Sequence, residues 1–164
     1  MADGGASSFI MLVTALLISG SVSAILVTEW GKATTVIQKS ERKATYESAI
    51  SIEFAGDPAM VSYDVQPGVN DTISFYVLNS GSHEMSTIYD VLIDGLSPGS
   101  TTESIVPSGT EWLPGYLLLV SVDDSSFSYS DGDDINLYFV GLSEELAGNT
   151  YSSVMMKEVR LNVI

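Results

Sequence analysis

The chain contains no cysteine, one histidine and only six lysine and arginine residues among its 164 positions. The lack of cysteine excludes disulfide frameworks, thiol catalysis and thiolate zinc sites. The single histidine, His83, leaves only one imidazole for any Ser-His-Asp arrangement. The 21 acidic residues give a net charge of −15 and a pI near 4.1, which argues against sequence-independent binding to nucleic acid. These absences make catalysis the minority interpretation.

The acidic residues are concentrated in the C-terminal part of the chain. Residues 1–47 carry four acidic and four basic side chains and are neutral overall. Residues 48–164 carry 17 acidic side chains and two basic ones, Lys157 and Arg160, and so hold the whole charge of −15. We therefore predict two parts: a transmembrane helix and stalk over residues 1–46, and an acidic β-sandwich domain over residues 47–164.

An apolar run near the N-terminus is long enough to cross a membrane. No charged residue occurs from Gly4 to Thr28, and the 19 residues from Phe9 to Val27 read FIMLVTALLISGSVSAILV. A spanning helix needs about 20 apolar residues, and Trp30 follows where an indole would lie at the lipid–water boundary. The alternative is a cleaved secretory signal, but such signals have a basic start and an apolar region of about 7–15 residues. We predict a retained anchor.

Small residues recur at four-residue spacing inside this run. Ala15, Ser19 and Ser23 fall on one stripe of the predicted helix, and Gly20 and Ala24 lie beside it. Small side chains let helices approach closely in a bilayer, so these five residues form a predicted helix-packing site. The alternative is that small residues are simply common in membrane helices.

The helical pattern continues beyond the apolar run. Apolar residues keep the i, i+3, i+4 spacing from Trp30 to Ala44, and no proline precedes Pro58. A helix from Ser8 to about Thr45 would be roughly 57 Å long at 1.5 Å per residue. Its second part is too polar for a protein core, so we predict a stalk that packs on a neighbour.

After Tyr46 the spacing of apolar residues changes from about 3.6 to 2. Alternating runs separated by Gly, Pro, Asn and Asp predict about eight short strands without helices between them. We expect an all-β domain, an immunoglobulin-like antiparallel β-sandwich that lacks the Cys–Trp–Cys signature, with a small closed barrel as the alternative. The predicted strands are residues 46–54, 61–65, 73–77, 89–93, 104–106, 116–122, 135–140 and 154–164.

Signals for chemistry in this domain are weak, and we assign no catalytic, cofactor-binding or metal-binding residue. The densest acidic group lies at two predicted turns and lacks the ligand spacing of a helix–loop–helix calcium site. A solvated acidic hairpin is the favoured interpretation, and a Ca²⁺ site is the alternative. The group consists of Asp123, Asp124, Asp131, Asp133 and Asp134.

Three isolated residues carry further predictions. His83 lies in a polar turn and is expected to be an exposed loop imidazole. Asn70 starts the sequence Asn-Asp-Thr, which is a glycan acceptor motif if the domain lies outside the cell. Trp112 lies in a turn before Pro114-Gly115 and is expected to cap the core, the alternative being contact with a partner.

The order of these features resembles the archaellum (archaeal flagellum) stator proteins of the FlaF/FlaG family, and FlaG more closely. The resemblance covers most of the chain and rests on an ordered set of segments: SSFIMLVTALLISGSVSAILV, SAISIEFAGDPAMVSYD, ISFYVLNSGSHEMSTIYDVLIDG, WLPGYLLLVSV and YSDGDDINLYFVG. Proteins of that family have a type IV pilin-like N-terminal membrane helix and an immunoglobulin-like sandwich outside the membrane.

This resemblance implies a non-catalytic role in motility. It implies a stator or scaffold component that assembles with itself, with a sister stator subunit and with other archaellum components, and that links the motor to a surface-layer protein. It also implies a single pass through the cytoplasmic membrane, with the C-terminal domain on the extracellular, pseudo-periplasmic side. The basic residues from Lys32 to Lys43 favour the cytoplasmic side, but that bias is overridden by long translocated domains, so we expect the outside.

Two other functions are open to a chain of this composition. A type IV pilin-like filament subunit, an archaellin or a pilin, would also pack through its helix. Prepilin processing in those families uses a basic residue and glycine before the apolar run, whereas this chain has Asp3-Gly4-Gly5-Ala6. A surface hydrolase using paired carboxylates is the second alternative. Helix packing and strand-edge pairing both predict self-association, and no nucleic acid is expected as a partner.

Overall fold

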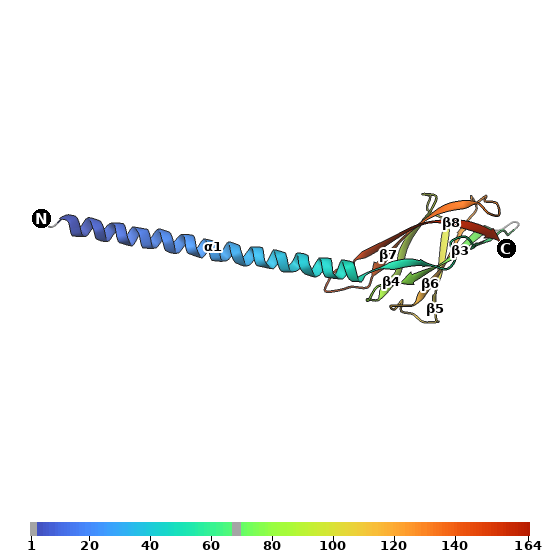
Figure 1. The fold of residues 1–164 in the computed structure, drawn as a ribbon, viewed down its shortest axis with the longest axis horizontal. Helices are drawn as coiled ribbons and strands as arrows, with labels where there is room; N and C mark the ends of the chain where they lie inside the picture. The colour runs from blue at the N-terminus through green and yellow to red at the C-terminus, as the bar shows by residue number, and fades with distance from the viewer. Residues whose placement is uncertain (1–2, 67–69) are drawn as a thin grey trace. The chain divides into compact units, whose positions relative to one another are not determined.

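The computed structural model describes residues 3–66 and 70–164, which form one helix followed by eight strands (Figure 1). The chain divides into two compact units, Met1–Ala44 and Thr45–Ile164. The first unit is helical, and the second contains the eight strands and the last residues of the helix. This division falls close to the boundary between residues 46 and 47 that the sequence suggested.

The helix α1 (Asp3–Ala49) runs without interruption past the end expected near Thr45. Tyr46 and Ser48 were expected in the first strand, and this prediction is wrong because both lie in the last turns of the helix. Two alternating positions are too few to set a period, and extending an existing helix adds one hydrogen bond for each residue fixed. Tyr46 and Ile50 are also spaced i, i+4, so the same apolar residues fit a helical face.

The second unit is built from short strands of four to twelve residues. β2 pairs with β8 in parallel, and every other strand pairing is antiparallel. The hydrogen-bonded order is β4-β7-β8-β2-β3-β6-β5, and β1 also pairs with β3. The strands are β1 (Ile52–Ala55), β2 (Val61–Asp64), β3 (Asp71–Asn79), β4 (Met85–Ile93), β5 (Ser100–Val106), β6 (Leu117–Asp124), β7 (Asp134–Ser143) and β8 (Ser152–Val163).

This pairing produces one continuous sheet instead of two separate sheets. β2 is hydrogen-bonded to β3 on one side and to β8 on the other, so it joins strands that a two-sheet sandwich would keep apart. The sheet is therefore barrel-like, with β4 and β5 at its two ends. The prediction of a β domain after a long N-terminal helix is confirmed, whereas an immunoglobulin-like sandwich is not confirmed.

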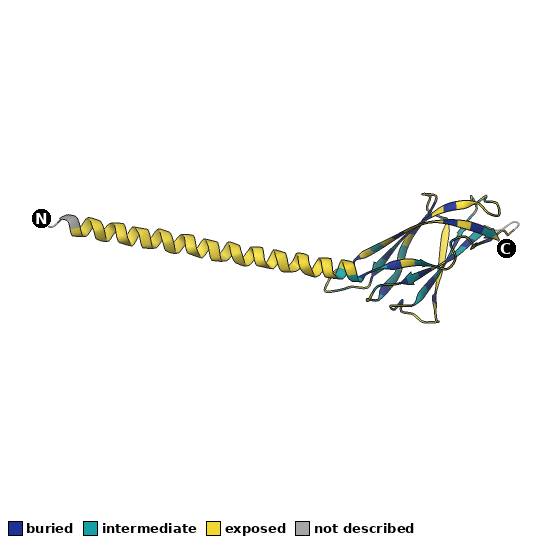
Figure 2. Cartoon of the chain, viewed as in Figure 1, coloured by how far each residue is buried: buried dark blue, intermediate teal, exposed yellow. Residues whose placement is uncertain are grey.

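The core of the second unit lies on the inner face of this curved sheet (Figure 2). Alternate residues of β3, β6 and β7 are fully buried, as the period of 2 requires. Trp112 has 0% exposure, and its indole Nε1 donates to the carbonyl of Tyr116 at 3.0 Å. The prediction that Trp112 belongs to the core is confirmed.

Two strands, β6 and β8, are only partly covered by neighbouring parts of the domain. The nearly continuous apolar run of residues 116–122 predicts a strand covered on both faces, and this prediction is wrong because Leu117 and Leu119 on the outer face of β6 are only half-buried. The last strand pairs with β7 along most of its length and with β2 only over residues 161–163. β8 therefore has a hydrogen-bonded strand on both sides near its C-terminal end, and it pairs with β7 alone over its first half.

Candidate functional site

The helix of the first unit is exposed at every residue from Gly5 to Ala44 (Figure 2). From Phe9 to Val27 the large apolar side chains are 38–74% exposed, although the same residue types are buried in the second unit. The mean hydropathy of the most apolar 18-residue window is 2.4, and none of that window is buried. α1 is therefore long and apolar enough to span a membrane.

Polar side chains inside the apolar run make hydrogen bonds within the helix itself. The hydroxyl of Thr14 donates to the carbonyl of Ile10 at 2.8 Å, and that of Ser23 donates to the carbonyl of Ser19 at 2.8 Å. Hydroxyls without partners would oppose transfer into lipid, because hydrocarbon offers none. These bonds make the segment compatible with a bilayer interior.

The five small residues predicted to pack against another helix all lie on the exposed surface of α1: Ala15, Ser19, Gly20, Ser23 and Ala24. A Cβ atom built on Gly20 meets nothing within 4 Å, so the position is open in the single chain. Packing through this stripe stays a prediction.

Beyond the apolar run, α1 carries aromatic and charged side chains. Trp30 is 77% exposed. The Nζ atom of Lys32 lies 2.7 Å from Oε1 of Glu29, but both side chains are more than 60% exposed. Ion pairs exposed to this degree contribute little to stability, so backbone hydrogen bonding and not this pair maintains the helix here.

The last turn of α1 is attached to the β domain through the turn before β4. The carbonyl of Ala49 accepts the N–H of Ser82 at 2.8 Å, and the carbonyl of Ser51 accepts the N–H of Gly81 at 3.0 Å. A Cβ atom at Gly81 would lie 2.6 Å from the oxygen of Ala49, so this close approach requires glycine. We name residues 46–51 and 79–83 the junction.

Aromatic side chains surround the junction. The ring of Tyr46 lies 5.6 Å from that of Tyr151 and 5.9 Å from that of His83. His83 was expected to be an exposed loop imidazole, and this prediction is wrong because it is half-buried beside Tyr46. The sequence alone could not predict the burial of His83, because the ring of Tyr46 that contacts it comes from the distant helix α1.

Asn79 is the junction residue whose role sequence reasoning missed. Its side chain is 0% exposed and donates from Nδ2 to the carbonyls of His83 and Trp112, each at 2.9 Å. Its Oδ1 accepts the N–H of Gly81 at 3.1 Å. A buried amide that is satisfied in this way fixes the turn, because leaving its groups unpaired would be costly. The signal available in the sequence was the polar residue ending an apolar strand.

The β domain differs in chemistry between its two ends. At the junction end, the outer face of the sheet carries Leu78 opposite Leu117, which in turn lies opposite Val106. At the opposite end the strands terminate in acidic residues, with Asp71 opposite Asp124. We name this the aspartate end; it holds Asp64, Asp71, Asp94, Asp123, Asp124, Asp131, Asp133 and Asp134.

The carboxylates of the aspartate end bind backbone and hydroxyl groups. Asp133 accepts the N–H of Ser130 at 2.7 Å, and Asp131 accepts that of Val163 at 3.1 Å. Asp134 forms a two-bond ion pair with Arg160, which lowers the pKa of the Asp134 carboxyl. No group of three or more His, Cys, Asp or Glu residues is placed to hold a metal ion among residues 3–66 and 70–164.

A tyrosine–aspartate network joins the aspartate end to the core. The hydroxyl of Tyr63 donates to Asp71 at 2.7 Å, and that of Tyr129 donates to Asp94 at 3.0 Å. Burial, followed by the bond to Asp94, raises the pKa of Tyr129 to about 12. Burial and the bond to Asp71 also raise the pKa of Tyr63. Both phenols therefore act as hydrogen-bond donors at neutral pH.

The predicted glycan acceptor is accessible, but its motif is engaged. Asn70 is exposed immediately before β3. The hydroxyl of Thr72, the third residue of the motif, donates to Oδ1 of Asp123 at 2.5 Å. Modification of Asn70 stays a prediction.

An apolar patch covers part of the outer face of β7 and β8. Tyr138 lies opposite Met156 and Val140 lies opposite Val154. Met156 is 73% exposed and Val154 is 52% exposed. We name these four residues the β7–β8 patch. Exposed apolar side chains that gather in this way commonly mark an interaction surface.

No protein-family model, curated protein or solved structure matches the chain.

Proposed function

We propose that this chain is a non-catalytic, membrane-anchored structural component of the archaellum motor, a stator or scaffold. The observation that carries the proposal is the exposed apolar surface of α1 from Phe9 to Val27, followed by unbroken helix to Ala49. A helix satisfies its own backbone hydrogen bonds, so it can present apolar side chains to lipid. The hydrogen bonds at the junction then transmit force between the helix and the β domain.

The immunoglobulin-like character of the β domain is part of this proposal. The order β1-β3-β6-β5 corresponds to strands A, B, E and D of that fold, and the order β4-β7-β8 corresponds to strands C, F and G. On this assignment β1 and β2 are two halves of strand A, and β2 crosses over to pair with strand G. The assignment accounts for the continuous sheet without requiring a closed barrel.

We propose that the protein self-associates and contacts a sister stator subunit. The β7–β8 patch supports association through the β domain, because a contact at this patch would remove exposed apolar area from water. The small-residue stripe of α1 supports association through the helix. Both surfaces are open in the single chain.

We further propose that the β domain lies on the extracellular side of the cytoplasmic membrane and contacts the surface layer. The support is the charge: the aspartate end collects eight carboxylates at the end of the domain opposite the junction, with Arg160 as a neighbouring base. A surface of one sign attracts cationic partners over a distance of about 10 Å at 0.1 M salt. A surface layer rich in bound cations would be such a partner.

Two measurements in the native host test this proposal. Deletion of the gene should abolish swimming and leave archaellin synthesis intact, and expression of the full chain should restore swimming. Sheared filaments should lack the protein, which should stay in the membrane pellet. Normal swimming of the deletion strain would refute the stator role, and abundant protein within sheared filaments would favour the pilin-like filament subunit.

A further inference from the structure

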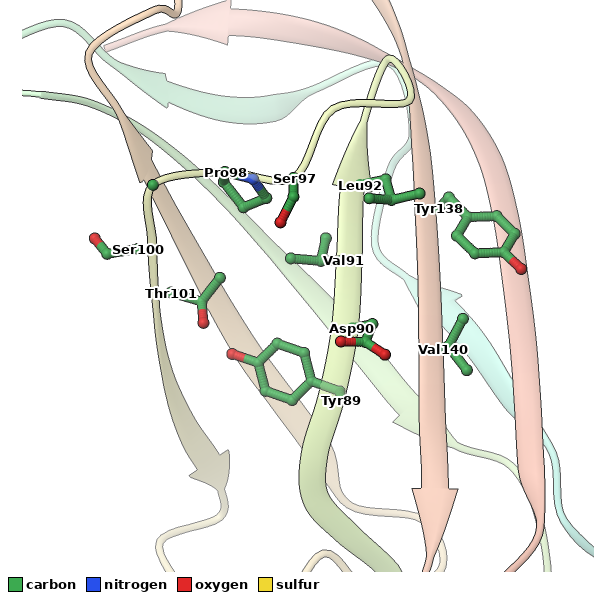
Figure 3. Close-up of a pocket in the computed structure, with 11 residues that line it drawn as sticks. Tyr89, Asp90, Val91, Leu92, Ser97, Pro98, Ser100, Thr101, Tyr138 and Val140 are labelled. Atoms are coloured by element: carbon green, nitrogen blue, oxygen red, sulfur yellow. The ribbon is translucent and has the colours of Figure 1, made fainter.

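A cleft lies between β4 and β5, the two strands at the ends of the sheet (Figure 3). Its volume is about 460 Å³, which is in the range of ligand sites. Tyr89 and Val91 point from β4 toward β5, and Ser97 and Pro98 of the connecting link lie across one end (Figure 3). β4 and β5 are not neighbours in the hydrogen-bonded order, so the cleft separates two sheet edges.

The link between the two strands begins as a strand beside β4 and then leaves it. The N–H of Ile93 donates to the carbonyl of Leu96, and the N–H of Leu96 donates to the carbonyl of Ile93, each at 2.9 Å. Continuing this ladder would place Pro98 opposite Val91, where proline has no N–H to donate. The chain turns away to pair with β6 instead. The cleft is the space that a continued strand would fill.

The pairing of β4 with β7 fixes which backbone groups face this space. Asp94 donates its N–H to the carbonyl of Asn136 on β7 at 2.9 Å, whereas Ile93 makes its bonds on the opposite side. Backbone groups alternate sides along an antiparallel strand. Tyr89 and Val91 therefore turn their N–H and C=O groups toward the cleft, and β4 presents an open hydrogen-bonding edge there.

The charged groups around the cleft are all acidic. Asp90 is exposed at the rim, and Glu103 accepts the hydroxyl of Tyr89 at 3.3 Å. Ser100 donates to Asp123 at 3.4 Å beside the far wall. None of the eleven lining residues is basic. An extended segment that carries Lys or Arg would be attracted to this edge, and an acidic segment would be repelled.

We propose that the free edge of β4 binds an extended, basic segment of another polypeptide by strand addition. The main chain of the segment would pair with Tyr89 and Val91. A Lys or Arg side chain would face Asp90, and an apolar side chain two residues away would face Leu92. This recognition site goes beyond the proposed anchoring role and does not depend on it.

Peptide binding to the full-length protein in an uncharged detergent tests the proposal. The probes are seven-residue peptides with lysine or glutamate at the central position and valine two residues to either side of it, so that the charged and apolar side chains share one face of the strand; binding is measured by fluorescence anisotropy. The lysine peptide should bind more tightly than the glutamate peptide. Asp90→Lys should weaken binding of the lysine peptide roughly three- to tenfold, as expected for a cross-strand charge pair. The same change should reduce or reverse the difference in affinity between the lysine and glutamate peptides.

The matched control is Glu158→Lys, which makes the same charge change at an exposed position of β8. It should leave affinity for the lysine peptide nearly unchanged. Equal losses in the two variants would reduce the effect to general attraction by an acidic protein and would overturn the proposal. Failure of the lysine peptide to bind at millimolar concentration would also overturn it.

Amide hydrogen exchange gives a second readout that charge alone would not produce. Saturating lysine peptide should slow exchange at Tyr89 and Val91, whose N–H groups face the cleft. Asp90 and Leu92 already face β7 and should change little. Slowing at none of these amides, or equally at all four, would contradict strand addition even if the peptide binds.

Discussion

The helix and the β domain use apolar residues in opposite ways. From Phe9 to Val27, α1 exposes its large apolar side chains, whereas the second unit buries side chains of the same types to 9% exposure or less in its core. Each strand needs a neighbouring strand for its backbone groups, so its apolar face is drawn into a shared core. A helix needs no such neighbour. Apolar character predicts removal from water, which the strands achieve within their own domain and the described part of α1 does not achieve within the single chain.

The largest expected effect comes from placing charges inside the apolar run. Leu16→Arg combined with Leu17→Arg should cost roughly 6 kcal/mol of membrane insertion, since each central Arg costs about 3 kcal/mol. The double variant should be released from membranes by alkaline carbonate. Thr34→Arg with Thr35→Arg, outside the apolar run, is the control and should stay in the pellet. Retention of both variants would contradict the assignment of the spanning segment.

The two tryptophans lie in different environments, Trp112 in the core of the second unit and Trp30 exposed on α1. Trp112→Ala should lower the free energy of unfolding of the β domain by about 3–5 kcal/mol, because it leaves a large cavity. Trp30→Ala removes an indole that is 77% exposed and should change that free energy by less than about 0.5 kcal/mol. Denaturant titration of the full chain in detergent measures both values. Similar losses of unfolding free energy for the two variants would contradict the different environments that the exposed fractions of the two indoles indicate.

Glycine substitutions compare the junction with the apolar run of α1. Gly81→Ala should destabilise the β domain by about 1–3 kcal/mol, because its Cβ atom would overlap the backbone at Ala49 and Ser51. Gly20→Ala has open space and should leave the unfolding transition unchanged. A tolerated Gly81→Ala would show that the junction is looser than its hydrogen bonds imply.

The smallest expected effect is a change in how the stability of the β domain depends on pH. The pKa of Tyr129 is raised to about 12, so the folded state keeps this proton after an unfolded tyrosine, with a pKa near 10, has lost it. The resulting stability is present below pH 10 and is lost as the pH rises from 10 toward 12. Tyr129→Phe should flatten this decline in denaturation midpoint, while Tyr76→Phe on the outer face should preserve it. If the denaturation midpoint of Tyr129→Phe declined with pH as steeply as that of the unchanged protein, the raised pKa of Tyr129 would be refuted.

The sequence predicted the elements whose period was long or strictly kept. The apolar run of α1 and the alternating cores of β3, β7 and β8 lie where expected, because repeated spacing defines a buried face. The start of the first strand was misplaced, since Tyr46 and Ser48 fit either period. The continuous sheet was not predictable, because β2 pairs with both β3 and β8 over only three residues each.

The site was harder to predict than the fold. Asn79 looked like an ordinary turn residue, and its role depends on carbonyls of His83 and Trp112 that only the fold brings together. The cleft beside β4 depends on a link that turns away at Pro98. Contacts between residues distant in sequence created both features, and no local pattern marks them.

The central claim is that residues 9–27 remain attached to the chain and lie in a lipid bilayer. Intact-mass spectrometry of the native protein recovered from carbonate-washed membranes tests it most directly. The protein should be in the membrane pellet with a mass that includes the whole apolar run. Recovery of a water-soluble protein that lacks its first thirty residues would contradict the anchor, the stalk and the proposed mechanical role together.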